Sequence, residues 1–147
     1  MWERYLFEIY VPKCYVESMY KTRIYYQDTD AGGVVYFANY LKFAEKSWFE
    51  YLLSIGIDLM EWQSQDTYII VKTVHLDLME KILYGDTITV KTEVKEVKNA
   101  YFILEHTVLK DEKITTRIET TMVCISGQGR PKRIPDGFKD KLLKQLE

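Results

Sequence analysis

The sequence has few cysteines, prolines and glycines, and no long uninterrupted hydrophobic run. Its 147 residues include 2 Cys, 3 Pro and 7 Gly, which excludes a collagen-like or linker-rich chain. Cys14 and Cys124 lie far apart and form no CxxC pair, which excludes a zinc cluster and makes a disulfide framework improbable. We therefore expect both cysteines to be small buried side chains in a reducing compartment.

The sequence predicts neither a signal peptide nor a membrane-spanning helix. Charged residues interrupt the apolar ones near the N-terminus, and no segment approaches the roughly 20 apolar residues that a spanning helix needs. The 20 Lys and Arg against 22 Asp and Glu give a net charge of −2, whereas proteins that bind nucleic-acid backbones usually carry a basic excess. We expect a cytoplasmic protein with no nucleic-acid partner and no membrane insertion.

Aromatic and aliphatic residues are abundant. The chain has 12 Tyr, 6 Phe and 3 Trp, and 47% of its residues are apolar. This supply is sufficient for the core of one domain of this length. We expect a single domain over residues 1–147, with an N-terminal arm at 1–13 and a C-terminal helix at 136–147.

The hydrophobic pattern predicts one long helix and five strands. From Ala38 to Ile55, apolar residues recur at three- and four-residue steps, which is typical of a helix with one buried face, here including Leu41. Period-two patterns and β-branched runs predict the strands Val16–Tyr26, Tyr68–Leu78, Thr87–Val97, Tyr101–Leu109 and Ile114–Cys124.

Short turns between the later strands predict an antiparallel meander of four strands, because a parallel crossover needs a dozen or more residues. Tyr68–Val71 is apolar on both faces, which is typical of a central strand. The long helix and the sheet must bury their apolar faces against each other, so the predicted class is α+β.

One segment, Tyr25–Tyr40, combines residue types that suit a hydrolytic site. Asp28 and Asp30 lie in a glycine-rich turn just before the long helix. A carboxylate can activate water or attack a carbonyl, and free amides at a helix start can stabilise a developing negative charge. Asp and Gly are also ordinary turn formers. From these residues alone, a purely structural turn is therefore the alternative.

The run DTDAGGVVYFANY, at residues 28–40, resembles the signature of hotdog-fold acyl-CoA thioesterases of the 4-hydroxybenzoyl-CoA thioesterase family, especially the Tol-Pal-associated bacterial branch. The resemblance continues through the long helix, the LYGDTITV segment and the closing VCISGQGRPKRIP. It implies a single hotdog domain, in which an antiparallel sheet wraps around one long central helix. The implied reaction is hydrolysis of an acyl-CoA thioester to a carboxylic acid and free coenzyme A, without a metal or a cofactor.

The resemblance also implies roles for single residues. Asp30 corresponds to the catalytic carboxylate, as general base or nucleophile, and the backbone amide on or next to Phe37 corresponds to the oxyanion donor. Tyr26 matches a tyrosine that some relatives place beside the aspartate, and Gly33 and Val34 lie where the backbone approaches the substrate. Close relatives in the Tol-Pal branch have a histidine in place of Phe37, so only the backbone contribution is expected at this position.

A basic segment, Gly129–Arg133, follows the last strand. From residue 129 to 147, six Lys and Arg face three Asp and Glu, which gives a local charge of +3. This charge predicts either a solvated surface or a binding site for the phosphates of coenzyme A, formed by Arg130, Lys132 and Arg133.

Other polar residues have structural interpretations. Asp28 is predicted to cap a turn and Asn39 to cap the helix, and an orienting role in the site is the alternative for each. His75 and His106 lie on predicted strands without the spacing of metal ligands or of a triad, so they are predicted to be structural.

The resemblance further implies that sheets pair into a homodimer or homotetramer with the active site at the subunit boundary. Two other functions stay open. One is a hotdog dehydratase acting on an acyl-carrier protein, although such sites use a histidine in a different motif. The other is a non-catalytic acyl-binding or scaffolding protein associated with envelope machinery. A carrier protein in place of coenzyme A is also left open.

Overall fold

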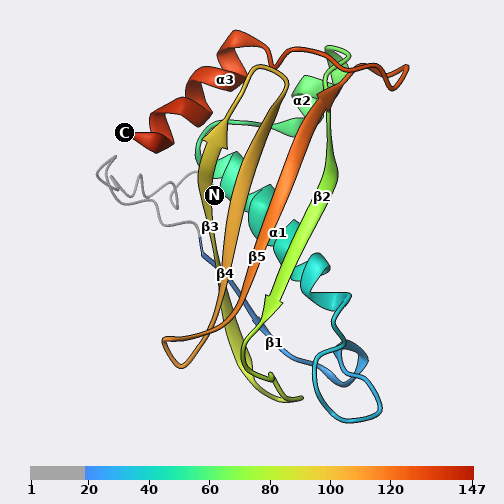
Figure 1. The fold of residues 1–147 in the computed structure, drawn as a ribbon, viewed down its shortest axis with the longest axis vertical. Coiled ribbons are helices and arrows are strands. Elements are labelled where there is room, and N and C mark those ends of the chain that lie inside the picture. The colour runs from blue at the N-terminus through green and yellow to red at the C-terminus, as the bar shows by residue number, and fades with distance from the viewer. Residues whose placement is uncertain (1–18) are drawn as a thin grey trace, which may run out of the picture.

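A computed structural model describes residues 19–147 as one curved antiparallel sheet with helices on its concave side (Figure 1). The predicted N-terminal arm, Cys14 and residues 16–18 lie outside the described part of the chain. The strands follow the order β1-β3-β4-β5-β2 across the sheet. The elements are β1 (Met19–Arg23), η2 (Tyr26–Asp28), α1 (Asn39–Ser54), α2 (Leu59–Ser64), β2 (Tyr68–Leu78), β3 (Thr87–Val97), β4 (Tyr101–Lys110), β5 (Lys113–Ile125), α3 (Asp136–Leu143) and η3 (Lys144–Leu146).

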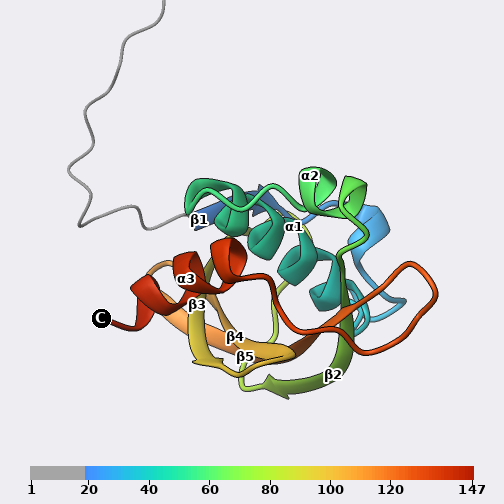
Figure 2. The same cartoon turned by 90° about the horizontal axis from the view of Figure 1, so that it is seen from above.

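The sheet wraps around α1, as the view along the strands shows (Figure 2). This arrangement confirms the predicted α+β class. The α1 helix begins and ends within one residue of the predicted Ala38–Ile55, and α3 with η3 confirms the predicted C-terminal helix. Buried side chains form two clusters under the helix, one around Phe102, Leu104 and Phe138 and the other around Phe43, Val90 and Val108.

The buried face of α1 differs in part from the prediction. Leu41 was expected to be buried, but its side chain is 40% exposed. Ser47 is instead fully buried, because its hydroxyl donates to the Val90 carbonyl oxygen at 3.2 Å and is within 2.6 Å of the Thr92 hydroxyl. A hydrogen-bonded polar side chain thus occupies a position that hydrophobicity alone would assign to the surface.

The predicted place of β2 in the sheet is wrong. β3, β4 and β5 form the expected meander, but β2 pairs with β5 at the far edge and not with β3. The apolar run at Tyr68–Val71 is therefore not a central strand: Ile70 is 44% and Val71 42% exposed. The apolar residues on both faces of this segment predict a strand that is buried on both sides. Within residues 19–147, no other part of the chain buries them.

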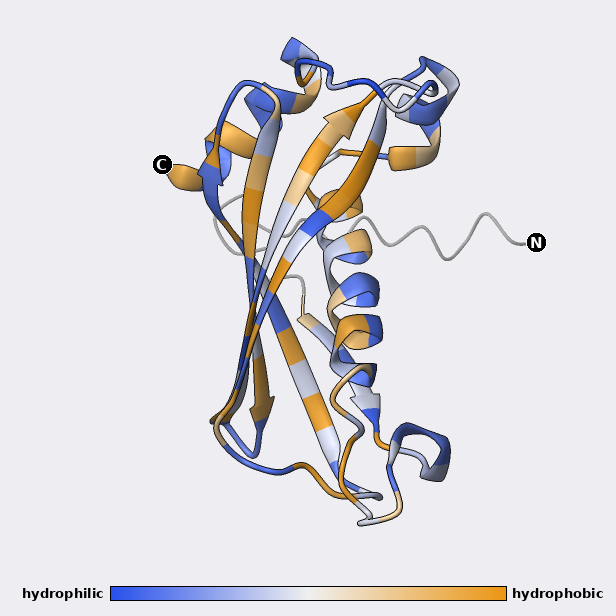
Figure 3. Cartoon of the chain, turned by 45° about the vertical axis from the view of Figure 1, so that its right-hand side comes forward, coloured by the Kyte–Doolittle hydropathy of each residue, from blue (hydrophilic) through white to orange (hydrophobic). Residues whose placement is uncertain are grey.

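Along β3, β4 and β5, buried and exposed residues alternate, as the period of a strand requires. Figure 3 shows this as alternating hydrophobic and hydrophilic bands. α2 was not predicted; its first turn is capped by the Asp58 carboxylate, which accepts from the Met60 N–H at 2.9 Å. None of the helices in residues 19–147 combines the length and hydrophobicity needed to cross a membrane.

A chain of buried hydrogen bonds runs from α1 across the inner face of the sheet. The Thr120 hydroxyl lies 2.9 Å from His106 Nε2, and His106 Nδ1 lies 2.8 Å from the Thr92 hydroxyl. Because the Val90 carbonyl can only accept, Ser47 donates to it, Thr92 donates to Ser47, and Nδ1–H of His106 donates to Thr92. This order leaves Nε2 as the acceptor from Thr120 and confirms a structural role for His106.

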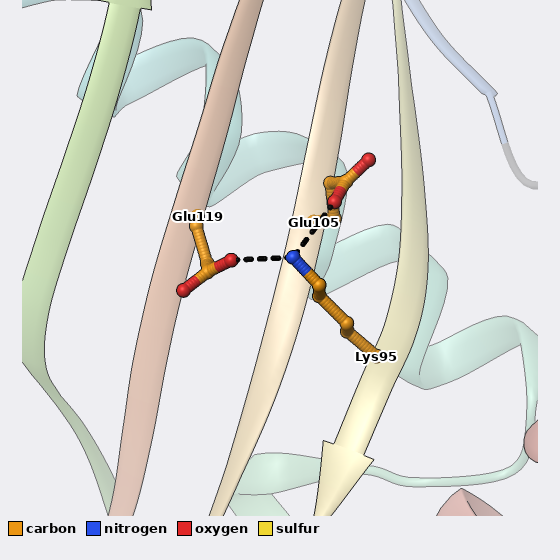
Figure 4. A network of polar contacts seen from close by, with 3 residues as sticks. All are labelled: Lys95, Glu105 and Glu119. Atoms are coloured by element: carbon orange, nitrogen blue, oxygen red, sulfur yellow. Dashed lines mark hydrogen bonds and ion pairs between the residues drawn. The ribbon is translucent and has the colours of Figure 1, made fainter.

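The outer face of the sheet carries glutamates from neighbouring strands. Glu105 and Glu119 pair directly across β4 and β5, an arrangement of like charges that is unfavourable without a counterion. The Lys95 ammonium lies 3.3 Å from Glu105 and 2.7 Å from Glu119 (Figure 4). Hydrogen bonds to these two carboxylates raise the pKa of Lys95.

Candidate active site

The segment between η2 and α1 folds as a small β-hairpin. The Asp30 N–H donates to the Val34 carbonyl oxygen and the Tyr36 N–H to that of Asp28, both at 2.9 Å. At the tip, the Gly33 N–H donates to the Asp30 carbonyl oxygen at 3.0 Å, and Gly33 has φ +77°. A hairpin loop closed in this way needs a residue in the left-handed conformation, which glycine adopts without strain.

The second leg of this hairpin is joined to the segment that follows β2. The Val35 N–H donates to the Ile82 carbonyl oxygen at 2.9 Å, and the Tyr84 N–H donates to that of Gly33 at 3.3 Å. Val34 and Leu83 form a bridge between the two segments. The hairpin is thereby fixed at the end of β2, beside the start of α1.

The Asp30 carboxylate is exposed at the tip of the hairpin. Its Oδ1 accepts a hydrogen bond from the Gly32 N–H at 2.8 Å, whereas Oδ2 has no partner within residues 19–147. A Cβ atom added to Gly32 would lie 3.2 Å from Oδ1, so this glycine allows close contact between backbone and carboxylate. The sequence reasoning singled out Gly33 and missed Gly32, although the Asp-x-Gly spacing of an Asx turn was the available signal.

The backbone N–H groups at the start of α1 are the second component of the site. Within residues 19–147, the amides of Phe37 and Ala38, which come just before the first helical residue, donate no hydrogen bond. Ala38, the N-cap residue, offers no capping side chain. The Phe37 side chain is 57% exposed, and its ring centroid lies 4.8 Å from that of Tyr36. Free amides and the positive end of the helix dipole together suit a developing oxyanion.

Asn39 does not cap the helix as predicted, because it is the first helical residue and its side chain donates rather than accepts. Its Nδ2 donates to the Asp28 carbonyl oxygen at 2.9 Å. Asp28 has the expected turn-capping role, since its Oδ2 accepts from the Tyr25 N–H at 2.8 Å. The bond from Asn39 joins the base of the hairpin to the helix.

Tyr26 lies on η2, next to the hairpin. Its side chain is 81% exposed, and its ring packs edge-on against Tyr84 with centroids 6.1 Å apart. Its hydroxyl forms no hydrogen bond within the described residues. A catalytic part for Tyr26 therefore stays a prediction.

Val34 and the first turn of α1 line a cleft beside the hairpin. The cleft has a volume of about 200 Å³, and its walls include Val34, Tyr40 and the segment 78–82. Most of these side chains are apolar, among them Leu78 and Met79, which are 49% and 46% exposed. The walls of this cleft beside the Asp30 hairpin are therefore mainly apolar.

The basic segment lies at the opposite end of the same chain. Residues 126–133 follow β5 at one end of the sheet, and the Asp30 hairpin lies at the other (Figure 1). Lys132 has structural bonds: its Nζ donates to the Asp66 carbonyl oxygen at 2.9 Å and to the Thr67 hydroxyl at 2.8 Å. Arg130 and Arg133 have exposed side chains with no ion pair in residues 19–147. A single chain does not bring the three cations to Asp30.

The described residues hold no group of His, Cys, Asp and Glu that could bind a metal ion. His75 is exposed on β2, while burial lowers the pKa of His106 to about 4. Cys124 is buried as predicted, and burial raises the pKa of its thiol.

Comparisons with known proteins all point to the thioesterase class of enzymes. Residues 25–142 match the family described as the Thioesterase-like superfamily. The chain is 33% identical over 122 residues to the Acyl-CoA thioesterase YbgC of Haemophilus influenzae, covering 82% of this chain and 90% of the relative. It is 27% identical over 118 residues to the 1,4-dihydroxy-2-naphthoyl-CoA hydrolase of Thermosynechococcus vestitus, covering 79% and 80%.

The fold matches solved structures as well. A hypothetical protein from Thermus thermophilus aligns over 88% of this chain and 99% of its own, with a TM-score of 0.83 and 21% identity. This likeness confirms the architecture of a curved antiparallel sheet around a long helix. The predicted Tol-Pal branch is finer than these similarities resolve.

Proposed function

Since the chain belongs to the thioesterase-like superfamily, we propose that it hydrolyses acyl-CoA thioesters at the Asp30 hairpin, giving a carboxylic acid and free coenzyme A. The observation that carries this proposal is the hairpin itself. It presents a carboxylate with one unpartnered oxygen next to a helix start with free amides. Those are the two groups that thioester hydrolysis needs, a base or nucleophile and an oxyanion donor.

In the general-base route, Oδ2 of Asp30 takes a proton from water, and the resulting hydroxide adds to the thioester carbonyl carbon. The carbonyl oxygen becomes an oxyanion that accepts from the Phe37 amide. When the carbonyl re-forms, the C–S bond breaks, and the thiolate takes the proton from Asp30. In the alternative route Oδ2 attacks the carbon directly, the C–S bond breaks and the coenzyme A thiolate leaves. Water then hydrolyses the resulting anhydride to the carboxylic acid and the free Asp30 carboxylate, and a proton from that water reaches the thiolate.

The direct test is release of thiol from acyl-CoA substrates of several chain lengths. We expect free coenzyme A to appear in proportion to enzyme concentration. Binding of acyl-CoA without thiol release would contradict hydrolysis and favour a non-catalytic acyl-binding protein. Hydrolysis in ¹⁸O-labelled water under single-turnover conditions tests the nucleophile route, because ¹⁸O enters Asp30 only when water adds to Cγ of the anhydride, whereas the general-base route puts the label in the product acid alone.

We propose that two chains complete the site by pairing their β2 strands. Within residues 19–147, one edge of β2 pairs with β5 and the other with no strand. Ile70, Val71, Val74 and Leu78 are between 38% and 49% exposed along it. An exposed apolar edge is a template for another strand, and a two-fold axis pairs identical strands antiparallel.

Antiparallel pairing would bring the ends of two chains together. Residues 126–133 adjoin the start of β2, because Tyr68 pairs with Ile125 and Lys132 binds Asp66. The Asp30 hairpin adjoins the segment that follows the end of β2. The basic segment of one chain would therefore lie toward the Asp30 hairpin of the other, where it could bind coenzyme A phosphates.

We expect light scattering at micromolar concentration to give the mass of two or four chains. The double variant Val71→Lys/Val74→Lys should shift this mass toward one chain, because it places like charges on both sides of the proposed axis. Exposed Lys72→Gln, on the same strand, is the matched variant that adds no charge to the apolar edge. A wild-type monomer that turns over thioester would contradict the shared site.

The basic segment should contribute to substrate binding and not to the chemical step. Replacing Arg130 and Arg133 by alanine is expected to raise KM for acyl-CoA and leave kcat nearly unchanged, since phosphates lie far from the reacting carbonyl. Each exposed contact is expected to contribute about 0.2–1 kcal/mol, and added salt should weaken the effect. Lys132→Ala is measured separately, because Lys132 also holds the loop at Asp66.

Two controls test this assignment. Lys144→Ala removes an exposed cation from η3 and should leave KM unchanged. A short thioester without the nucleotide should not distinguish the double variant from wild type. Equal impairment on that substrate would assign the segment to folding or to the subunit interface.

A further inference from the structure

We propose that Asn39 is a positioning residue that holds the Asp30 carboxylate at its working distance from the amides at the start of α1. The inference rests on the proposed function, since it concerns the same site. Asn39 touches neither of these groups directly. It acts through the Asp28 carbonyl, to which its side chain donates at 2.9 Å.

The Asp28 carbonyl oxygen accepts two hydrogen bonds, one from Asn39 Nδ2 and one from the Tyr36 N–H, both at 2.9 Å. A carbonyl oxygen can only accept, so the nitrogen end of the Asn39 amide must face it. Asp28 and Asn39 are both half-buried, and a bond partly shielded from water holds its geometry better than an exposed one.

This bond connects the two halves of the site. Asp28 lies two residues before Asp30, on the first leg of the hairpin, and Asn39 lies two residues after Phe37, in the first turn of α1. The hairpin's own base is closed by the Tyr36 N–H alone. The Asn39 side chain therefore adds the link between the leg that carries the carboxylate and the start of the helix, which directly follows the oxyanion donor.

The relative placement of these two groups matters because both must act on one thioester carbonyl. A misplacement of about 1 Å between reacting groups can cost about 10²-fold in rate. A helix cap would not have this effect: it needs a side-chain oxygen that accepts from the helix, and Asn39 donates away from it.

The test compares Asn39→Asp, Asn39→Ala and Asn39→Gln with wild type. Aspartate keeps the shape but has no N–H to donate, and its charge is favourable in the first turn of a helix, so this variant should fold. We expect kcat to fall about 10- to 100-fold for Asp and Ala, with KM within about threefold. Glutamine keeps the donor on a longer side chain and should restore part of kcat. A merely structural residue would lower the melting temperature and leave the kcat of the folded fraction unchanged.

Hydrogen exchange of the Tyr36 amide, followed by NMR, gives a readout that needs no activity. We expect faster exchange in Asn39→Asp, because the Asp28 carbonyl loses the second bond that fixes it. If wild type hydrolyses acyl-CoA and Asn39→Asp keeps kcat within about twofold, the inference is overturned and the proposed function stands. If wild type releases no thiol, the proposed function fails. Unchanged Tyr36 exchange would then overturn the structural part of the inference too.

Discussion

Replacing Asp30 by asparagine is expected to lower kcat by at least about 10²-fold while leaving the melting temperature unchanged. The amide keeps an oxygen that can accept from the Gly32 N–H, so the tip of the hairpin should hold its shape. It cannot take a proton from water or attack a carbonyl, so both proposed routes lose their first step. Thiol release and thermal unfolding of the same preparation measure the two effects.

Asp58→Asn is the matched control for this substitution. Asp58 caps α2, away from the hairpin, and asparagine is an equally good cap. We expect wild-type kcat and stability for this variant. Activity of Asp30→Asn within a few-fold of wild type would remove Asp30 from the mechanism and point to water activation by another group.

The second large effect concerns stability at low pH. His106 is fully buried, and burial lowers its pKa from 6.5 to about 4. Between these two values the unfolded chain binds a proton at His106 and the folded chain does not, so the free energy of unfolding must fall as pH falls. The loss begins near pH 6.5, is complete near pH 4, and amounts to about 3 kcal/mol at about 1.36 kcal/mol per unit. Above pH 6.5 His106 contributes no pH dependence.

Urea unfolding at intervals from pH 7.5 to 4 would measure this loss. His106→Gln removes the titrating group but keeps a donor and an acceptor, so it should unfold more easily at pH 7 and depend less on pH below it. His75→Gln is the control, because His75 is exposed on β2. Equal pH dependence in wild type and His106→Gln would show that other groups, such as Asp86 with its lowered pKa, account for the acid sensitivity.

The sequence predicted where strands begin and end more reliably than which strands pair with each other. Tyr68–Leu78 and Thr87–Val97 coincide with β2 and β3, because residue periodicity is a local property. The place of β2 beside β5 could not be predicted in the same way. The hydrophobicity of Tyr68–Val71 reports that the strand needs cover, and it does not report whether the cover comes from the same chain.

The sequence predicted which residues form the candidate site but not the hydrogen bonds that hold them in place. The motif indicated Asp30 and the helix start, and the structure places them on a hairpin and the helix that follows it. The bond from Asn39 to Asp28 runs opposite to the capping bond that residue statistics favour. Local preferences describe what an asparagine most often does, whereas the fold decides which acceptor lies within its reach.

The low burial of the hairpin has a consequence for how this chain can change over evolution. Of residues 28–37, only Val35 belongs to a buried cluster; the others are exposed or half-buried. Substitutions of exposed side chains away from special backbone positions usually change stability by less than about 0.5 kcal/mol. The side chain at position 37, which is 57% exposed, can therefore change at almost no cost to folding. The backbone amide stays in place through such changes, so the proposed oxyanion donor does not depend on which side chain position 37 carries.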